Sequence, residues 1–183
     1  KYADQKELVA AVGDADALIV RSDKVTAEVV EAASRLKIVV RAGAGYDNLD
    51  LAACTAKGVV AMNTPGQNSN AVAELAIAMM IYMARSQFTP ATGSEIMGKT
   101  LGIQAFGNVG RLVGAKGAAL GMKVKALDPF LTAEQIKAGG AEPLSSLEEL
   151  YGGCDYISVH IPATPQTVGS IGYDLIIRMP NGA

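Results

Sequence analysis

One stretch decides the fold of this chain: Thr100-Leu101-Gly102-Ile103-Gln104-Ala105-Phe106-Gly107-Asn108-Val109-Gly110. Its apolar start predicts a strand, and the residues after it predict a helix over Asn108–Leu120 and a second strand over Lys123–Leu127. The pattern that includes Gly107 and Gly110 approximates G-x-G-x-x-G, which gains meaning where a strand precedes it and a helix follows. This context predicts a βαβ unit that binds a dinucleotide.

The residues of this turn have separate expected tasks. Gly107 lets the backbone approach a pyrophosphate, and Gly110 lets the helix pack on the sheet. The free amides of Asn108 and Val109 point at the anion, with the positive end of the helix dipole behind them. Ala105 replaces the first glycine of the pattern, and we expect its methyl group to open the turn slightly without abolishing the site.

An acidic residue follows the second strand. Asp128 lies 18 residues beyond Gly110, and a carboxylate at about this distance accepts both ribose hydroxyls of an adenosine and repels a 2′-phosphate. We therefore expect NAD rather than NADP as the cofactor. The alternative is a glycine-rich turn in some other α/β domain, with Asp128 an ordinary residue at the end of a strand.

The rest of the chain alternates apolar runs with amphipathic stretches. Further strands are predicted at Ala17–Val20, Lys37–Val40, Val59–Met62 and Tyr156–Val159. Further helices are predicted at Asp4–Val12, Thr26–Ser34, Leu49–Lys57, Thr132–Ala138 and Ser145–Tyr151. Strands and helices that alternate in this way predict an α/β fold whose parallel sheets are covered on both faces.

The predicted helix over Ser69–Arg85 differs because it is apolar all round. Such a helix has to be covered on every side, either by two domains or by a second subunit. Turn-forming residues follow it over Ser86–Ser94. We therefore predict a domain boundary here, with domains over residues 1–87 and 88–183.

Composition favours small-molecule chemistry. Of the 183 residues 50% are hydrophobic and 19% are charged, and the net charge is −2. Because Lys and Arg are not clustered, we expect neither nucleic acid nor an anionic membrane as a partner.

The cysteines and the N-terminus bear on the cellular compartment. Cys54 and Cys154 lie 100 residues apart, which indicates neither a disulfide framework nor a zinc site, so we expect no metal and a reducing environment. Residues 1–5 lack the apolar core of a signal peptide, and the apolar run Ala71–Ala84 is too short to span a membrane. We expect a cytoplasmic protein.

Four segments together resemble the D-2-hydroxyacid dehydrogenase family, most closely its members that act on D-3-phosphoglycerate. They are Val40–Asp50 (VRAGAGYDNLD), Asn63–Glu74 (NTPGQNSNAVAE), Gly98–Ile103 (GKTLGI) and His160–Thr167 (HIPATPQT). The resemblance covers nearly the whole chain in colinear order. It implies two doubly wound parallel-sheet lobes, a flavodoxin-like substrate lobe and a Rossmann-type NAD lobe, both incomplete in this chain.

The resemblance also implies a substrate site. In the loop Arg41-Ala42-Gly43-Ala44-Gly45, the backbone at Gly43 and Gly45 would receive the substrate carboxylate, and Ala44 would contact the cofactor. Arg21, Ser22 and Arg41 would face a substrate phosphate, for which guanidinium groups are suited. The alternative for each arginine is an ordinary surface ion pair.

Further cofactor contacts follow from the same resemblance. Asn68 matches a family position near the cofactor, although an N-cap of the following helix explains an Asn equally well. His160, Ile161 and Pro162 match a strand end that lines the dinucleotide, not the catalytic imidazole of the family. A structural role and acid–base catalysis are the alternatives for His160, which is the only histidine.

The activity implied is NAD-dependent oxidation of D-3-phosphoglycerate to 3-phosphohydroxypyruvate, in serine biosynthesis, by a homodimer formed through residues 69–85. The catalytic Arg, Glu and His of the family belong to segments beyond the one that resembles Ile177–Ala183. We therefore assign no catalytic residue and expect a fragment, or the ordered part, of a longer polypeptide. Alternatives are a reductase of glyoxylate, hydroxypyruvate or another D-2-hydroxyacid, a corepressor-like NAD sensor, and a non-catalytic NAD-binding fragment.

Overall fold

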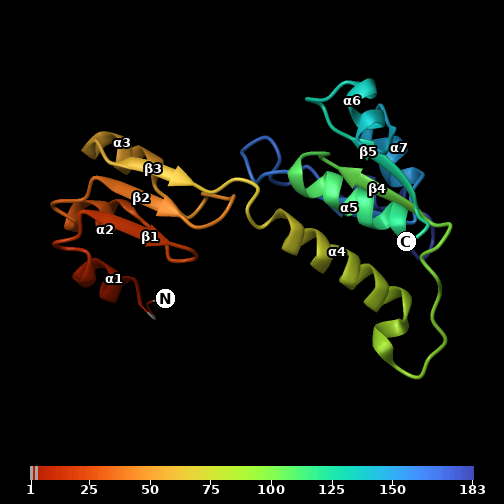
Figure 1. The fold of residues 1–183 in the computed structure, drawn as a ribbon, viewed down its shortest axis with the longest axis horizontal. Helices are drawn as coiled ribbons and strands as arrows, with labels where there is room; N and C mark the ends of the chain where they lie inside the picture. The colour runs from red at the N-terminus through yellow and green to blue at the C-terminus, as the bar shows by residue number, and fades with distance from the viewer. Residues whose placement is uncertain (1, 3) are drawn as a thin grey trace. The chain divides into compact units, whose positions relative to one another are not determined.

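A computed structural model of the chain describes residue 2 and residues 4–183 (Figure 1). The chain divides into two compact units, Lys1–Asn68 and Ser69–Ala183. Each unit contains its own parallel sheet, three-stranded in the first and four-stranded in the second. The α/β fold with parallel sheets expected from the sequence is confirmed.

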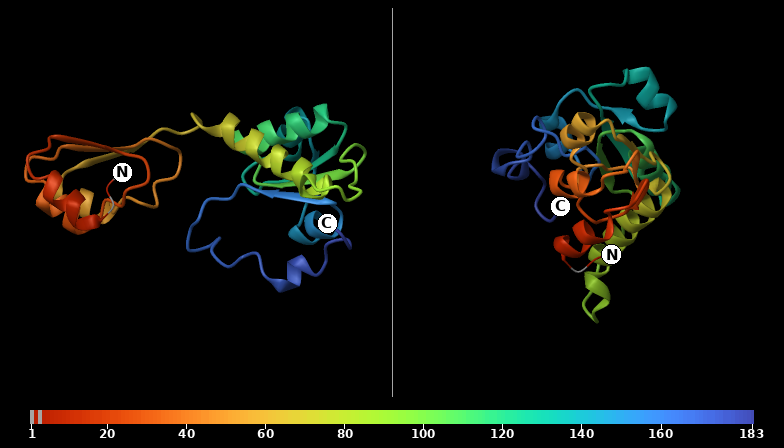
Figure 2. Two further views of the ribbon diagram at one scale, coloured as in Figure 1. Left: turned by 90° about the horizontal axis from the view of Figure 1, so that it is seen from below. Right: turned by 90° about the vertical axis from the view of Figure 1, so that its left-hand side faces the viewer.

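The first unit has three strands in the order β1-β2-β3. Its elements are α1 (Gln5–Ala11), β1 (Ala17–Val20), α2 (Ala27–Ala32), β2 (Ile38–Arg41), α3 (Leu51–Lys57) and β3 (Val60–Asn63). The three helices lie on one side of the sheet (Figure 2), where their apolar residues form one core with Val20 and Val39. For α2 and α3, which connect successive strands, this follows from the strand order, because crossovers of one hand that advance in one direction leave their helices on one face.

The other face of this sheet is open. Ile19, Val60 and Met62 are 74%, 55% and 50% exposed, and the register places Ile19 and Met62 on either side of Val40. The sequence led us to expect cover on both faces, whereas the described residues cover only one. These three exposed side chains make the open face apolar.

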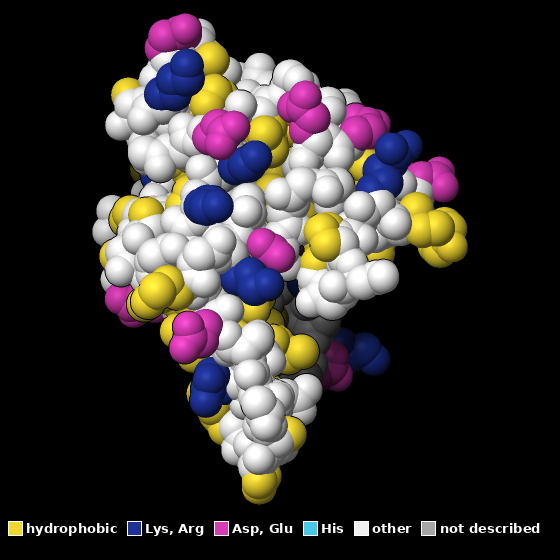
Figure 3. Space-filling view, turned by 90° about the vertical axis from the view of Figure 1, so that its right-hand side faces the viewer, with side chains coloured by type: hydrophobic (Ala, Val, Ile, Leu, Met, Phe, Trp, Pro, Cys, Tyr) yellow, Lys and Arg dark blue, Asp and Glu magenta, His cyan; other side chains and the backbone are white. Residues whose placement is uncertain are grey.

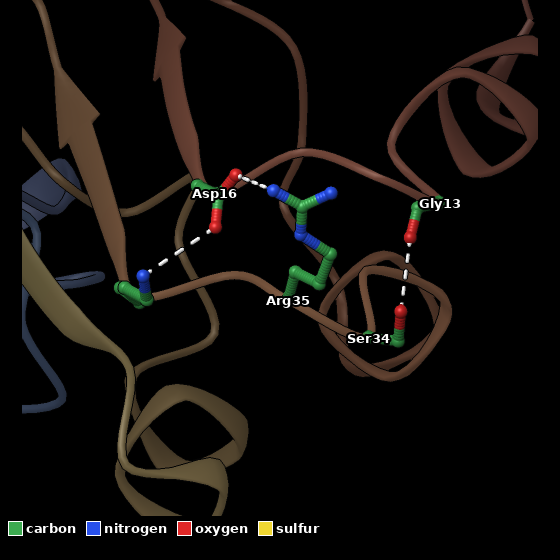
Figure 4. Close-up of polar contacts among 5 residues, drawn as sticks. Gly13, Asp16, Ser34 and Arg35 are labelled. Atoms are coloured by element: carbon green, nitrogen blue, oxygen red, sulfur yellow. Dashed lines mark hydrogen bonds and ion pairs between the residues drawn. The ribbon is translucent and has the colours of Figure 1, made fainter.

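Polar contacts tie the segment before β1 to the segment before β2 (Figure 4). The Asp16 carboxylate forms ion pairs with Arg35 and, at 3.5 Å, with Lys37. The Ser34 hydroxyl donates to the carbonyl of Gly13 at 3.1 Å. The Arg35 guanidinium holds the pKa of the Asp16 carboxyl below its usual value. These groups are solvent-exposed, so they contribute to geometry more than to stability.

The second unit has the strand order β6-β5-β4-β7. Its elements are α4 (Ser69–Ala84), the 3-10 helix η1 (Ser86–Phe88), β4 (Thr100–Gln104), α5 (Asn108–Ala119), β5 (Lys123–Leu127), α6 (Ala133–Ala138), β6 (Glu142–Pro143), α7 (Leu147–Gly152), β7 (Tyr156–Val159) and α8 (Tyr173–Ile176). The chain advances from β4 to β6 and then returns to place β7 on the other side of β4. This reversal makes the sheet doubly wound, and its switch point lies between the carboxyl ends of β4 and β7.

Both faces of this second sheet are covered. Leu101 and Ile103 of β4 belong to the core that includes α4 and α5. Between them, Gly102 faces α7, since a Cβ atom there would lie 2.7 Å from the Cys154 Sγ and 2.8 Å from Leu150. The missing side chain at residue 102 lets α7 approach the centre of the sheet.

The long apolar helix α4 belongs to the second unit. Ala73, Ile77 and Met80 are buried in the core shared with α5. The boundary between the two compact units falls after residue 68, because α4 packs on α5. The described residues leave the opposite side of α4 exposed, where its apolar residues are Val72, Leu75, Met79, Tyr82 and Met83.

No helix in the described part of the chain is both long and apolar enough to cross a membrane. On the face drawn in Figure 3, Lys and Arg side chains are interspersed with Asp and Glu.

Candidate functional site

The turn after β4 is held against the end of β5 by two backbone amides. The Ala105 amide donates to the Leu127 carbonyl at 2.9 Å, and the Phe106 amide donates to the Asp128 carboxylate at 2.8 Å. The Phe106 side chain is fully buried. The turn is thus fixed to the end of β5 before α5 begins at Asn108.

Gly107 and Gly110 lack side chains for different reasons. A Cβ atom at Gly110 would lie 2.3 Å from the Ala105 carbonyl oxygen and 3.1 Å from the Ile103 side chain, so close packing of α5 on β4 requires glycine there. A Cβ atom at exposed Gly107 would meet no protein atom within 4 Å. Nothing in the described chain requires glycine at residue 107, whereas a ligand that approaches the backbone would.

The first turn of α5 offers unpaired amides. The first intrahelical bond of α5 runs from the Arg111 amide to the Gly107 carbonyl, at 3.0 Å. Among the described residues, no acceptor is bonded to the amides of Asn108, Val109 or Gly110. Three free amides at the positive end of a 12-residue helix suit an anionic ligand.

The Asp128 carboxylate is shared between two amides. One oxygen accepts from the Phe106 amide and the other from the Phe130 amide, at 2.8 and 2.9 Å. Each carboxylate oxygen keeps a second lone pair for a further donor. Asp128 thus both closes the turn and remains half-exposed beside it.

Ala105 has a left-handed backbone conformation with a φ of 71°. We expected its methyl group to open the turn slightly, and the structure instead accommodates it through this unfavourable dihedral angle. The left-handed region is costly for a residue with a Cβ atom and free of that cost for glycine.

Ala105→Gly is therefore expected to stabilise the chain by about 0.5–1 kcal/mol. The substitution relieves about 1–2 kcal/mol of backbone strain in the folded state, and the greater conformational freedom of glycine in the unfolded state offsets part of this gain. Urea unfolding followed by circular dichroism measures this change. Ala118→Gly in α5, where φ is helical, is the control and should destabilise by up to about 1 kcal/mol. A destabilised Ala105→Gly variant would contradict the strain assigned to Ala105.

The carboxyl end of β7 lies beside this turn. The His160 amide donates to the Gln104 carbonyl at 2.9 Å, which extends the β4–β7 ladder to residue 160. His160, Ile161 and Pro162 therefore follow β7 at the same sheet edge as Ala105. Parallel sheets of this topology bind ligands at that edge, next to the switch point.

The imidazole of His160 is half-buried, and its Nε2 lies 2.8 Å from the Ser158 hydroxyl oxygen. Burial lowers the pKa of His160, which favours a neutral ring. No carboxylate contacts the ring among the described residues, so the positioned partner typical of an acid–base histidine is missing from them.

In the first unit, two arginines lie together at the carboxyl ends of β1 and β2. The register pairs Val20 with Arg41, and the Arg41 Nε donates to the Arg21 carbonyl at 3.1 Å. Neither guanidinium forms an ion pair within the described residues. The surface ion pairs considered as the alternative are therefore not what holds these arginines, and both are available to an anion. Ser22 is exposed next to them.

The loop after β2 is well anchored. The Asn63 side-chain amide donates to the Ala44 carbonyl at 2.8 Å, and the Thr64 amide donates to the Gly43 carbonyl at 2.9 Å. The Arg41 guanidinium covers Gly43, where a Cβ atom would lie 1.5 Å from Nη1. A side chain at residue 43 would therefore displace the guanidinium group of Arg41.

One expected anion contact in this loop is already engaged. The Gly43 amide donates to the Arg41 carbonyl at 2.9 Å. We predicted that this amide would bind a carboxylate, but its hydrogen is already engaged. The amides of Ala44 and Gly45 are bonded to no acceptor in the described part of the chain. The loop amides that could bind an anion are therefore those of residues 44 and 45.

Asn68 is exposed and directly precedes α4. Its side chain makes no hydrogen bond to the described residues, so the capping bond considered as the alternative is not formed.

Two polar contacts near the turn were not foreseen. Arg111 places its guanidinium carbon 5.3 Å from the centre of the Phe106 ring, and its Nε donates to the Phe106 carbonyl at 3.1 Å. The buried Tyr151 hydroxyl donates to the Gln104 side chain at 3.0 Å. An arginine directly after Gly110 was the one available signal for the first contact, whereas the second joins residues 47 positions apart.

The chain matches the family model "D-isomer specific 2-hydroxyacid dehydrogenase, catalytic domain" over residues 2–159. Because this match covers most of the chain, the chain belongs to the D-isomer specific 2-hydroxyacid dehydrogenase family. Its fold and the positions of its glycine-rich turn agree with that membership.

Relatives within this family include D-3-phosphoglycerate dehydrogenases. That of Rattus norvegicus is 44% identical over 193 residues, which cover 97% of this chain and 36% of the relative. That of Mycobacterium tuberculosis is 42% identical over 195 residues, covering 98% and 36%. The chain therefore spans about a third of the length of these curated relatives.

Solved structures show the same fold. A 3-phosphoglycerate dehydrogenase from Entamoeba histolytica with bound NAD+ has a TM-score of 0.90 and 46% identity, covering 98% of this chain and 57% of that protein. A D-lactate dehydrogenase from Aquifex aeolicus, in complex with NAD and lactic acid, has a TM-score of 0.79 and 30% identity, covering 93% and 55%.

Proposed function

We propose that the protein to which this chain belongs oxidises D-3-phosphoglycerate at its 2-hydroxyl group, with NAD as the hydride acceptor, to 3-phosphohydroxypyruvate. The observation that carries the proposal is the turn at Gly107, where open space, three free amides and Asp128 occur together. Similarity to the phosphoglycerate dehydrogenases of Rattus norvegicus and Mycobacterium tuberculosis supports the choice of substrate.

The residues of the turn fit a dinucleotide. The amides of Asn108, Val109 and Gly110 would bind the pyrophosphate, and Gly107 leaves room for it. Asp128 would accept the ribose hydroxyls with its remaining lone pairs and would exclude a 2′-phosphate. His160, Ile161, Pro162, Asn68 and Ala44 are proposed as further cofactor contacts. When bound, NAD supplies the acceptor for the hydride from C2 of the substrate.

The substrate is proposed to use the unpaired donors of the first unit. The Gly45 amide would bind its carboxylate, near Gly43. The guanidinium groups of Arg21 and Arg41, with the Ser22 hydroxyl, would bind its phosphate, because both arginines lack an acidic partner among the described residues. No catalytic residue is proposed within this chain.

The organisation of the protein is also a proposal. We assign residues 1–87 to a substrate-binding domain and residues 88–183 to an NAD-binding domain.

The exposed apolar side of α4, formed by Val72, Leu75, Met79, Tyr82 and Met83, supports a homodimer. Buried, unpaired Cys54 and Cys154 are consistent with a reducing cytoplasm.

The cofactor assignment is tested by calorimetry of the chain with NAD and with NADP. We expect the unaltered chain to bind NAD more tightly than NADP. Asp128→Asn should weaken NAD binding about 10-fold, since a hydrogen bond to a charged group is lost, and should reduce the ratio of NAD affinity to NADP affinity. Asp174→Asn is the control, because the Asp174 carboxylate forms no hydrogen bond or ion pair with the described residues. Equal affinity of the unaltered chain for NAD and NADP would contradict the role of Asp128, and no binding of either would contradict the cofactor.

A further inference from the structure

The side chains of Ser158 and His160 contact each other at the carboxyl end of β7. Ser158 belongs to β7 and is buried, with 7% of its surface exposed. His160 follows two residues later and therefore points to the same side of the sheet. The 2.8 Å contact between the Ser158 oxygen and the His160 Nε2 is the one hydrogen bond formed by either side chain with the described residues.

This geometry distinguishes the two neutral forms of the imidazole. If Nε2 carried the proton, it would donate to the Ser158 oxygen, and the serine hydroxyl proton would then be buried without an acceptor. If Nε2 is unprotonated, the Ser158 hydroxyl donates to it and no buried donor is left unpaired. Buried donors without partners are strongly disfavoured, so the second arrangement is the stable one.

The remaining ring proton is then on Nδ1. That group has no partner among the described residues, and it belongs to a half-buried ring at the carboxyl end of β7, beside Ala105. A neutral ring with a single free N–H group is a hydrogen-bond donor to an uncharged or anionic oxygen, and it carries no positive charge of its own.

We propose that Ser158 is a positioning residue that holds His160 as the neutral Nδ1–H tautomer, so that Nδ1 donates to an acceptor oxygen of the bound dinucleotide. This inference rests on the proposed cofactor site and adds to it the residue that sets the orientation and the donor atom of the ring. His160 contacts the cofactor, and Ser158 acts only through His160.

The sole histidine of the chain makes the test direct. Nitrogen-15 NMR of the free chain reports the protonation of each ring nitrogen of His160 without overlap, and we expect the Nδ1–H form. In Ser158→Ala, the ring should redistribute toward the Nε2–H form and NAD affinity should fall about 3–10-fold. Ser158→Thr keeps the hydroxyl and should restore both. Ser170→Ala, whose hydroxyl bonds to a local carbonyl, is the control.

The outcomes separate this inference from the proposed cofactor. An Nε2–H tautomer in the unaltered free chain overturns the role of Ser158, and this measurement requires neither NAD binding nor a folded variant. A tautomer change in Ser158→Ala without a change in NAD affinity also overturns the role of Ser158, since NAD binding would then not depend on which ring nitrogen of His160 carries the proton. Absence of NAD binding in the unaltered chain overturns the proposed cofactor instead, which the tautomer measurement alone would not reveal.

Discussion

Gly110→Ala is expected to destabilise the second unit by about 3 kcal/mol, at the upper end of what overpacking of a core costs. The added methyl group would lie 2.3 Å from the Ala105 carbonyl oxygen. That oxygen belongs to a turn whose own amide is bonded to β5, so it cannot retreat freely. Either α5 moves away from β4 or the turn is distorted. Urea unfolding followed by circular dichroism measures the loss.

Gly107→Ala is the matched variant, with the same methyl group added three residues earlier. Apart from its chain neighbours, none of the described residues has an atom within 4 Å of a Cβ atom placed there. We therefore expect the stability of this variant to change by less than about 1 kcal/mol, the effect of a surface substitution with slight backbone strain. Its NAD affinity, measured by calorimetry, should fall at least about 10-fold, since the methyl group would occupy the space assigned to the pyrophosphate. Unchanged NAD affinity in Gly107→Ala would refute this placement of the cofactor, and equal stability of the two variants would refute the packing role of Gly110.

Arg41→Ala and Arg21→Ala are each expected to weaken binding of D-3-phosphoglycerate by about 10–100-fold, the loss of one charge-assisted contact of about 1.5–3 kcal/mol. Binding of D-glycerate, which has the carboxylate but no phosphate, should change by less than about threefold. The expected selectivity follows from the two guanidinium groups having no acidic partner in the described residues. Calorimetry with both ligands provides the comparison, and in the whole enzyme kcat/KM should follow the same order.

Arg35→Ala is the control for these two variants. It removes the same positive charge, but Arg35 is paired with Asp16 before the amino end of the sheet, so neither ligand should bind differently. Equal losses for D-3-phosphoglycerate and D-glycerate in Arg41→Ala and Arg21→Ala would contradict the phosphate assignment. That result would favour an unphosphorylated hydroxyacid, which is the main alternative substrate.

The locations of most helices and strands could be predicted because they depend on local periodicity. The predicted strands Ala17–Val20, Lys123–Leu127 and Tyr156–Val159 have the same bounds in the structure, and the helix predicted over Ser69–Arg85 ends one residue earlier. The strand β6 was not predicted, because two residues that include a proline carry no periodic signal. The short helix α8 was missed for a similar reason, since four residues are about one turn.

The candidate site was predictable to the extent that its residues form local patterns. The glycine-rich turn, the free amides after it and Asp128 at the next strand end all follow from spacing along the chain. The state of the anion loop was not predictable in the same way. That the Gly43 amide is engaged, and that Arg41 covers it, depends on how the chain turns after β2.

The sequence by itself determined the α/β class, the βαβ unit around Gly107 and the family to which the chain is similar. These follow from residue types at short separations, where backbone preference and side-chain periodicity act directly. Only the tertiary structure decided which side of α4 is buried and that Ser158 reaches the ring of His160. It also decided that Arg21 and Arg41 have no acidic partner among the described residues. Each of these depends on which distant segments pack together, and burial and hydrogen bonding are settled by that packing and not by any one segment.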